Sequence, residues 1–134
     1  MRRLLPFLFA LSLASACATT RQETAGSGAT PARKSPWQEG IASYYADSLH
    51  GRKTASGQPY DREAATCAHR THRFGTELVV QVVDTGQTTM CRVNDRGPFV
   101  RGRIVDLSKR LARELGLLER GLVRVRIAPR DAVE

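Results

Sequence analysis

The feature that most limits the fold of this chain is a series of short strand patterns between Gly40 and Ala128. Apolar residues alternate or cluster over residues 41–45, 77–83, 88–94, 104–107 and 122–128. Short segments of this kind, each bounded by Gly, Pro, Asn or Asp, are typical of strands in a small sheet protein. Because only about 90 residues carry the pattern, the sequence predicts a mainly β fold with one small closed barrel.

Two segments of the series have features of their own. Residues 77–83 form a nearly continuous apolar run, which is expected of a strand covered on both faces. Residues 47–73 contain Gly51, Gly57 and Pro59 and show no periodicity, so they are interpreted as one long irregular stretch. Loops of this length in compact domains tend to be functional.

One helix is expected after the strand at 104–107. Ser108 is a favourable N-cap, and Leu107, Leu111 and Leu115 repeat at four-residue spacing as one buried stripe. Gly116 is suited to end this helix in the left-handed conformation.

The N-terminus has the pattern of an export signal. Residues 1–16 combine two arginines, an apolar run too short to span a bilayer and small residues before Cys17. This arrangement predicts a lipoprotein signal peptide, lipidation of Cys17 and attachment to a membrane only through that lipid. Ala18 favours the outer membrane, facing the periplasm of the cell envelope. The alternative is a secreted protein in which Cys17 is incidental.

Residues 17–36 are rich in Ala, Thr, Gly, Ser and Pro and are interpreted as a flexible tether. The folded domain is expected over residues 37–130. If Cys17 is lipidated, Cys67 and Cys91 remain as an even pair in an oxidising compartment, which predicts a disulfide between them. The alternative is two buried free thiols.

Net charge narrows the possible partners. The chain carries a formal charge of +8, which falls to +6 when Arg2 and Arg3 leave with the signal. A basic chain usually suggests nucleic acid, but export to the periplasm argues against that partner. The charge therefore favours an anionic cell-wall polymer, or serves only solubility.

The segment Val93-Asn94-Asp95-Arg96-Gly97-Pro98-Phe99 is the strongest candidate for chemistry. It stands where an alternating strand ends, and Gly97 and Pro98 are expected to make that end a rigid rim. In an extended strand Cys91, Val93 and Asp95 share one face, so a bridge from Cys91 to Cys67 would hold the chain near His69 close to Asp95. The alternative is an ordinary turn in which Asp95 and Arg96 form a surface ion pair.

Six blocks of sequence in order resemble one known family. They are 42–45 (ASYY), 54–61 (TASGQPYD), 66–69 (TCAH), 74–76 (FGT), 94–99 (NDRGPF) and 102–108 (GRIVDLS). Together they closely resemble the rare lipoprotein A family, whose fold is a small six-stranded double-psi β-barrel with one or two short helices. The resemblance implies a peptidoglycan lytic transglycosylase that acts on peptide-free glycan strands. No metal is assigned, because His50 and His72 have no partner spacing that indicates a metal site, and no cofactor is expected. We expect a monomer without a nucleic acid partner.

The resemblance also implies roles for individual residues. Asp95 is the first candidate for a carboxylic acid that protonates the glycosidic oxygen and then acts as base, with Asp61 as a second carboxylate. His69 is a groove residue that would orient or tune the acid, and its alternative role is structural. Asp106 is interpreted as a cap or a buried hydrogen-bond acceptor rather than a catalytic group.

Substrate contacts are expected from a second set of residues in the same blocks. Aromatic stacking on sugar rings is expected from Tyr44 and Tyr45, although strand alternation places one of them in the core. Arg96 would pair with a carboxylate or neutralise Asp95. The remaining substrate-binding candidates are Thr54, Gln58 and Asn94.

Gln58 departs from the family pattern, in which active members carry Glu at this position. An amide neither donates nor accepts a proton at neutral pH, although it keeps the shape and the hydrogen bonding. The sequence therefore leaves two functions open: an enzyme with weak activity, or an expansin-like module that binds the cell wall without cleaving it. Many relatives add a C-terminal domain that recognises septal glycan, and the present sequence does not predict septal targeting.

Overall fold

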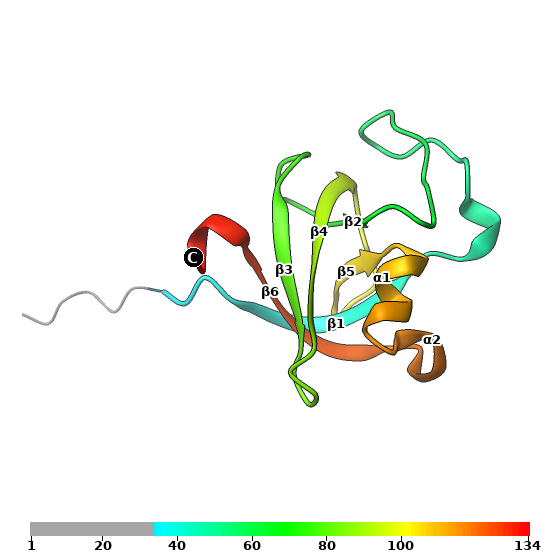
Figure 1. Cartoon of the computed structure of the whole chain (residues 1–134). Coiled ribbons are helices and arrows are strands. Elements are labelled where there is room, and N and C mark those ends of the chain that lie inside the picture. The colour runs from blue at the N-terminus through cyan, green and yellow to red at the C-terminus, as the bar shows by residue number, and fades with distance from the viewer. Residues whose placement is uncertain (1–33) are drawn as a thin grey trace, which may run out of the picture. The chain divides into compact units, whose positions relative to one another are not determined.

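The computed structural model describes residues 34–134, so the predicted signal peptide, the lipidation of Cys17 and most of the predicted tether lie outside the described residues. Figure 1 shows the described part as a β-barrel with short helices at its side. The strands are β1 (Gln38–Tyr44), β2 (Thr66–Ala68), β3 (Glu77–Val82), β4 (Thr88–Asp95), β5 (Arg103–Leu107) and β6 (Val123–Pro129). The helices are α1 (Lys109–Glu114), α2 (Leu117–Arg120) and the 3₁₀ turns η1 (Asp47–Leu49) and η2 (Arg130–Ala132).

The six strands close in the order β1-β5-β2-β4-β3-β6. Two of the pairings, β1 with β5 and β2 with β4, are parallel, and the other four are antiparallel. Parallel pairing needs a long connection between the partners, and here it places residues far apart in sequence on neighbouring strands. The predicted fold class, a mainly β protein with a small closed six-stranded barrel, is confirmed.

The barrel interior is a single apolar core that the strands fill by alternation. The strand pattern at residues 122–128 is confirmed as β6, and its alternate residues Val123, Val125 and Ile127 are buried. The prediction that the strand at 77–83 is covered on both faces is wrong. Only its alternate residues are buried, and Val83 beyond its end is 44% exposed, because antiparallel strands of a barrel pack one face inward and turn the other to water.

The stretch 47–73 is not entirely irregular. It contains η1 and the three-residue strand β2, which lies between β4 and β5. Three residues are too few to show a period, so β2 is defined by its two neighbours rather than by its own sequence. Pairing with β6 likewise starts β1 at Gln38, three residues before the expected start.

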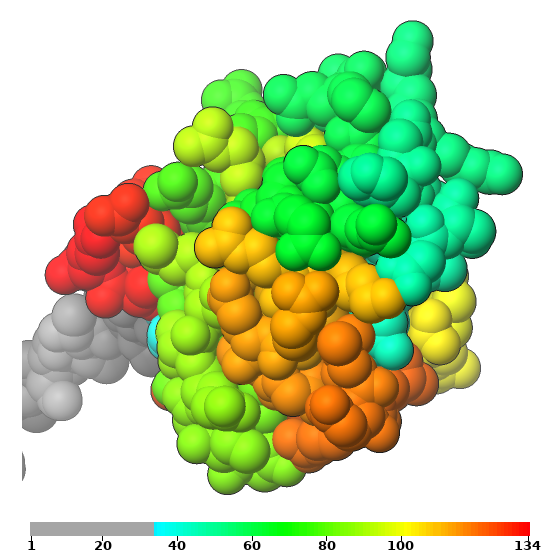
Figure 2. Space-filling view, turned by 45° about the vertical axis from the view of Figure 1, so that its right-hand side comes forward, coloured from blue at the N-terminus to red at the C-terminus, as the bar shows by residue number. Residues whose placement is uncertain are grey.

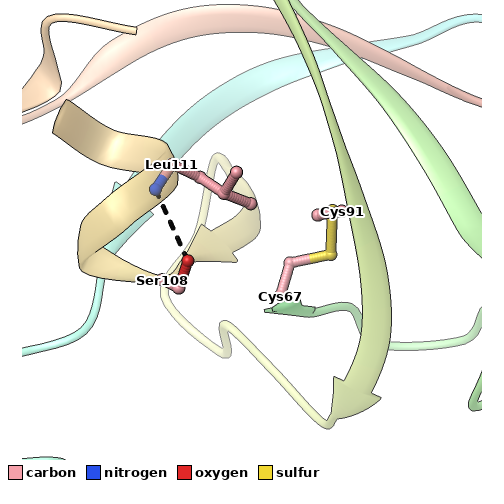
Figure 3. Close-up of a disulfide and its surroundings, with 4 residues drawn as sticks. All are labelled: Cys67, Cys91, Ser108 and Leu111. Atoms are coloured by element: carbon pink, nitrogen blue, oxygen red, sulfur yellow. Dashed lines mark hydrogen bonds between the residues drawn. A yellow bond between two sulfur atoms is a disulfide. The ribbon is translucent and has the colours of Figure 1, made fainter. Parts of the chain in front are cut away.

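The predicted helix is confirmed as α1. Ser108 is buried, and its hydroxyl accepts a hydrogen bond from the Leu111 amide at 3.5 Å (Figure 3). The stripe of Leu111 and Leu115 packs into the core. Gly116 adopts φ +69° as expected of a left-handed helix end, and α2 follows it directly.

The predicted disulfide between Cys67 and Cys91 is present, with a Cα–Cα distance of 5.7 Å. Figure 3 shows that it joins β2, at its central residue, to the body of β4, beside α1. Both cysteines are buried in the core cluster. The bridge therefore fixes β2, the shortest strand, to the strand that ends at Asp95. Within residues 34–134, no helix has the length and apolarity to cross a membrane.

Candidate active site

Two carboxylates lie in one row across the barrel. Ala68 of β2 is paired with Asp95 of β4 on one side and with Asp106 of β5 on the other, and Asp106 is also paired with Ser43 of β1. Neighbouring strands lie about 4.8 Å apart, so two strand spacings separate the two aspartates by about 10 Å at the backbone. This register brings together residues that are distant in sequence.

The row lies beside the long loop between β1 and β2. In Figure 1, β4 ends on the side of the barrel from which this loop projects, and Figure 2 shows the loop, coloured cyan to green, standing out above the helices. The loop contacts the end of β4 directly, because the Ala55 amide donates to Asp95 and the Ser56 amide donates to the Asn94 carbonyl. The loop and the strand end therefore form one site.

The carboxylate of Asp95 is held by three donors. Its Oδ1 accepts from the amides of Ala55 and Arg96, both at 2.8 Å, and its Oδ2 accepts from the Tyr45 hydroxyl at 2.6 Å. Because the two amides can only donate, both of their hydrogen bonds require Oδ1 to be the acceptor. Asp95 is thus fixed in orientation at the mouth of the barrel.

The two tyrosines that sequence analysis selected have different surroundings. Tyr44 packs against the hydrophobic core, in line with the expectation that one of the pair is a core residue. Tyr45 instead reaches Asp95, and its ring stacks on Tyr60 with centroids 4.4 Å apart. Burial and the hydrogen bond to Asp95 raise the pKa of Tyr45, so its hydroxyl stays a donor. Sequence analysis did not select the buried Tyr60.

Asp106 has a different environment from Asp95. The Ser43 hydroxyl donates to its Oδ1, which agrees with its interpretation as a buried acceptor. Burial raises the pKa of the Asp106 carboxyl, and the charge of Asp95 adds to the rise, while Ser43 and Arg103 oppose it. The raised pKa favours the protonated form. The sequence did not show that Asp106 shares a row with Asp95, because strand register is not visible in one sequence.

The ring of His69 does not face Asp95. Its Nδ1 accepts from the amides of Thr71 and His72, both at 3.1 Å, and its Nε2 lies 3.2 Å from Oε1 of Gln38. The backbone amide of His69 donates to the Asp95 carbonyl, which confirms the expected closeness of the two chain segments. The geometry therefore supports a positioning role through the turn 69–72 and no direct proton transfer with Asp95.

We expect His69 to make the fold sensitive to acid. The ring is 4% exposed, and burial, together with the charges of His72, Arg96 and Arg70, lowers its pKa from 6.5 to about 4. Since the folded-state pKa is depressed, the unfolded chain takes up the proton first, and stability falls as pH drops from 6.5 to 4. The loss should reach about 3 kcal/mol of unfolding free energy.

The matched variant is His69→Asn, whose amide oxygen can take the place of Nδ1 without titrating. Urea unfolding of both proteins across that pH range measures the effect. The variant should show a flatter dependence of unfolding free energy on pH, and an equal slope in both proteins would assign the acid sensitivity to other groups.

The two loop residues that the sequence indicated differ in role: Thr54 is buried and structural, whereas Gln58 is exposed and lines a cleft. Thr54 is buried, and its hydroxyl donates to the Gln58 carbonyl at 2.6 Å, which closes the loop. The side chain of Gln58 is exposed and lines a shallow cleft of about 320 Å³ together with Asn94 and Phe74. Asn94 is 5% exposed, and its Oδ1 has no hydrogen-bond partner among the described residues.

The structure contradicts the expected pairing of Arg96 with Asp95, and it leaves the role of Asp61 untested. Arg96 does not pair with the Asp95 carboxylate: its guanidinium donates to the carbonyls of His69 and His72 and lies 3.9 Å from the Phe74 ring centroid. The alternative of an Asp95–Arg96 surface pair is therefore also wrong. Asp61 is exposed and accepts from the Glu63 amide, without a recorded contact to Asp95, so its role stays a prediction.

The described residues contain no group of three His, Cys, Asp or Glu side chains arranged to hold a metal ion. His50 accepts a hydrogen bond from the Arg62 amide, and His72 lies against the ring of His69.

Comparison with known proteins gives matches over the barrel. A family model described as lytic transglycolase matches residues 37–127. A probable endolytic peptidoglycan transglycosylase RlpA from Treponema pallidum is 47% identical over 93 residues, which cover 69% of this chain and 29% of the relative. An endolytic peptidoglycan transglycosylase RlpA from Pasteurella multocida is 46% identical over 90 residues, which cover 67% of this chain and 31% of the relative.

The fold itself has a match among solved structures. A Clavibacter michiganensis expansin superposes with a TM-score of 0.55 at 22% identity, covering 69% of this chain and 50% of the expansin. This likeness concerns the fold alone. The present chain spans less than a third of the length of the two curated relatives.

Proposed function

Because this chain belongs to the RlpA-like family of lytic transglycosylases, we propose that its barrel cleaves the glycan strands of peptidoglycan and leaves anhydro-ended products. The observation that carries this proposal is the row of two carboxylates, Asp95 and Asp106, in unlike environments on either side of Ala68. Glycosidic cleavage needs one acid and one base, and such a pair supplies both.

The reaction proceeds by transfer of two protons. The bond between the anomeric carbon of one sugar and the bridging oxygen breaks, and the departing oxygen takes a proton from a carboxylic acid. A hydroxyl of the same sugar then bonds to the anomeric carbon and gives its proton to a carboxylate, so no water enters the product. The raised pKa of Asp106 suits the acid, and Asp95, whose carboxylate three donors hold in orientation, is proposed as the base.

The other residues of the site have supporting roles in this proposal. Tyr45 orients Asp95 through its hydroxyl, and Ser43 orients Asp106. His69 fixes the turn that carries the amide bonded to the Asp95 carbonyl. Gln58 and Asn94 line the neighbouring cleft and are proposed to contact the sugars.

The proposal also includes where the protein is located and how it is attached to the membrane. A protein that acts on peptidoglycan works in the cell envelope, and we assign this chain to the outer membrane, attached by lipid on Cys17. Peptidoglycan glycan strands are its partner, and the folded domain acts as a monomer.

The test is incubation of the purified chain with peptide-free glycan strands, followed by mass spectrometry of the soluble products. Fragments with anhydro ends support the transglycosylase. A second candidate, a wall-binding module without activity, is favoured by one observation, the amide of Gln58. Strands that co-sediment with the protein but stay intact would establish that candidate instead.

Gln58→Glu is expected to raise the rate of cleavage by roughly tenfold, because a carboxyl group can exchange a proton and an amide cannot. In the described part of the chain the exposed Gln58 side chain makes no hydrogen bond, so the fold should be unaffected. Initial rates of strand cleavage measure the effect, with Gln58→Ala as the control for side-chain contact. A Glu variant no faster than the natural protein would show that this position does not limit activity.

A further inference from the structure

Of the seventeen lysines and arginines in residues 34–134, nine make no ion pair. Ion pairs hold eight of the described arginines and lysines, on α1, α2, β4, β6, the loop before β2 and the C-terminus. Five of the nine arginines and lysines without an ion pair within residues 34–134 lie on two segments, the loop after β2 and the chain from the end of β4 to the start of β5. These residues, called the rim arginines, are Arg70, Arg73, Arg96, Arg101 and Arg103.

Hydrogen bonds bring the rim arginines together from two segments. The guanidinium of Arg70 donates to the carbonyls of Pro98, Val100 and Arg103, in the loop between β4 and β5. Arg96 of that loop donates in return to the carbonyls of the turn 69–72. The two segments are thus joined in both directions, and together they carry all five rim arginines.

Two interactions connect the rim arginines to the carboxylates of Asp95 and Asp106. Arg103 acts electrostatically on Asp106, and Arg96 donates its backbone amide to Asp95. Arg73 and Arg101 are exposed, and within residues 34–134 their side chains make no hydrogen bond, so they are available to a ligand. Phe99, two residues before Arg101 in the β4–β5 loop, is 80% exposed and offers a flat apolar surface for a sugar ring.

We propose that the rim arginines bind the carboxylates of the glycan strand, with Arg73 and Arg101 as the main contacts. This inference rests on the proposed function and adds the substrate feature that the site recognises. Clustering unpaired like charges is unfavourable in the free protein, and a ligand carrying regularly spaced anions relieves it. Arginine suits carboxylates because its planar fork donates two parallel hydrogen bonds.

Two sources supply carboxylates on peptidoglycan. In peptide-free strands each muramyl residue carries a free lactyl carboxylate, whereas in intact strands the carboxylates belong to the stem peptides. Both sources fit the rim arginines, and the experiment below separates them.

The experiment measures binding of the full chain to glycan strands at low and at physiological ionic strength. Every protein carries Asp95→Asn, so that binding is read without cleavage. The test variant adds Arg73→Gln and Arg101→Gln. The matched control instead adds Arg113→Gln and Arg124→Gln, which remove the same charge from exposed positions on α1 and β6. The ligands are peptide-free strands, the same strands with their carboxyls converted to neutral amides, and strands with stem peptides.

We expect the Arg73/Arg101 variant to bind peptide-free strands about tenfold more weakly than the control, and to lose most of the salt dependence. Amidated strands should bind both variants equally. A loss confined to peptide-bearing strands would assign the contacts to stem-peptide carboxylates. Equal binding of both variants to every ligand, or undiminished binding of amidated strands, would overturn the proposal.

Cleavage by the natural protein is scored separately. Carboxylate-dependent binding without cleavage would contradict the transglycosylase and leave the rim arginines in place. Cleavage whose rate does not depend on Arg73 and Arg101 would support the transglycosylase and contradict the role of the rim arginines.

Discussion

Asp95→Asn lowers the rate of glycan-strand cleavage by about a thousandfold, because an amide cannot accept the proton of the attacking hydroxyl. Asn keeps the size of Asp, and its oxygen can still accept from the amides of Ala55 and Arg96. Asp106→Asn should lower the rate by about a hundredfold or more, because the leaving oxygen then lacks its acid. Initial rates on peptide-free strands, measured by release of new ends, give both effects.

The control for this pair is Asp131→Asn, an exposed aspartate in η2 that makes no ion pair in the described part of the chain. It should cleave at the natural rate. Circular dichroism of all three variants should match that of the natural protein. If Asp106→Asn were as active as the control, one carboxylate, Asp95, would serve as acid and base in turn.

Removal of the disulfide by Cys67→Ala with Cys91→Ala lowers the unfolding free energy by about 3.5 kcal/mol, the chain-entropy value for a closed loop of this size. The two cysteines are 24 residues apart, and both are buried in the core. For a domain of about 100 residues the loss corresponds to a fall in melting temperature of roughly 15–25 °C. Thermal unfolding followed by circular dichroism measures it.

Reduction of the natural protein before unfolding is the matched control, because it opens the same loop without creating cavities. The two effects should agree within about 1 kcal/mol after allowance for the cavities that Ala leaves. A bridge-free variant that melts at the natural temperature would show that the packing of β2 between β4 and β5 is sufficient by itself.

Much of the barrel was predictable because its longer strands fill the core by alternation. Val123, Val125 and Ile127 show this period in the sequence, and all three are buried. The N-cap of α1 at Ser108 was also predictable, because a cap depends on a local sequence signal. β2 was not, because three residues carry no period and both of its partners are distant in sequence.

The candidate site was predictable in part. Asp95 was selected because a carboxylate, a glycine and a proline coincide at a strand end, and the structure holds that carboxylate with three donors. Asp106 and Ser43 were not selected, since their place in the row depends on register across β1, β5 and β2. The expectation that Arg96 pairs with Asp95 is wrong for a similar reason, because the partners of its guanidinium are carbonyls of a distant turn.

The most direct test of the account is cleavage of peptide-free glycan strands by the full chain in water enriched in heavy oxygen. A transglycosylase closes the anhydro ring with the sugar's own hydroxyl, so the account predicts products with no heavy oxygen, whose new ends are lighter than hydrolytic ends by one water. Products that carry one heavy oxygen at each new end would show hydrolysis and contradict the proposed reaction. Intact strands that still bind the protein would instead make this chain a wall-binding module.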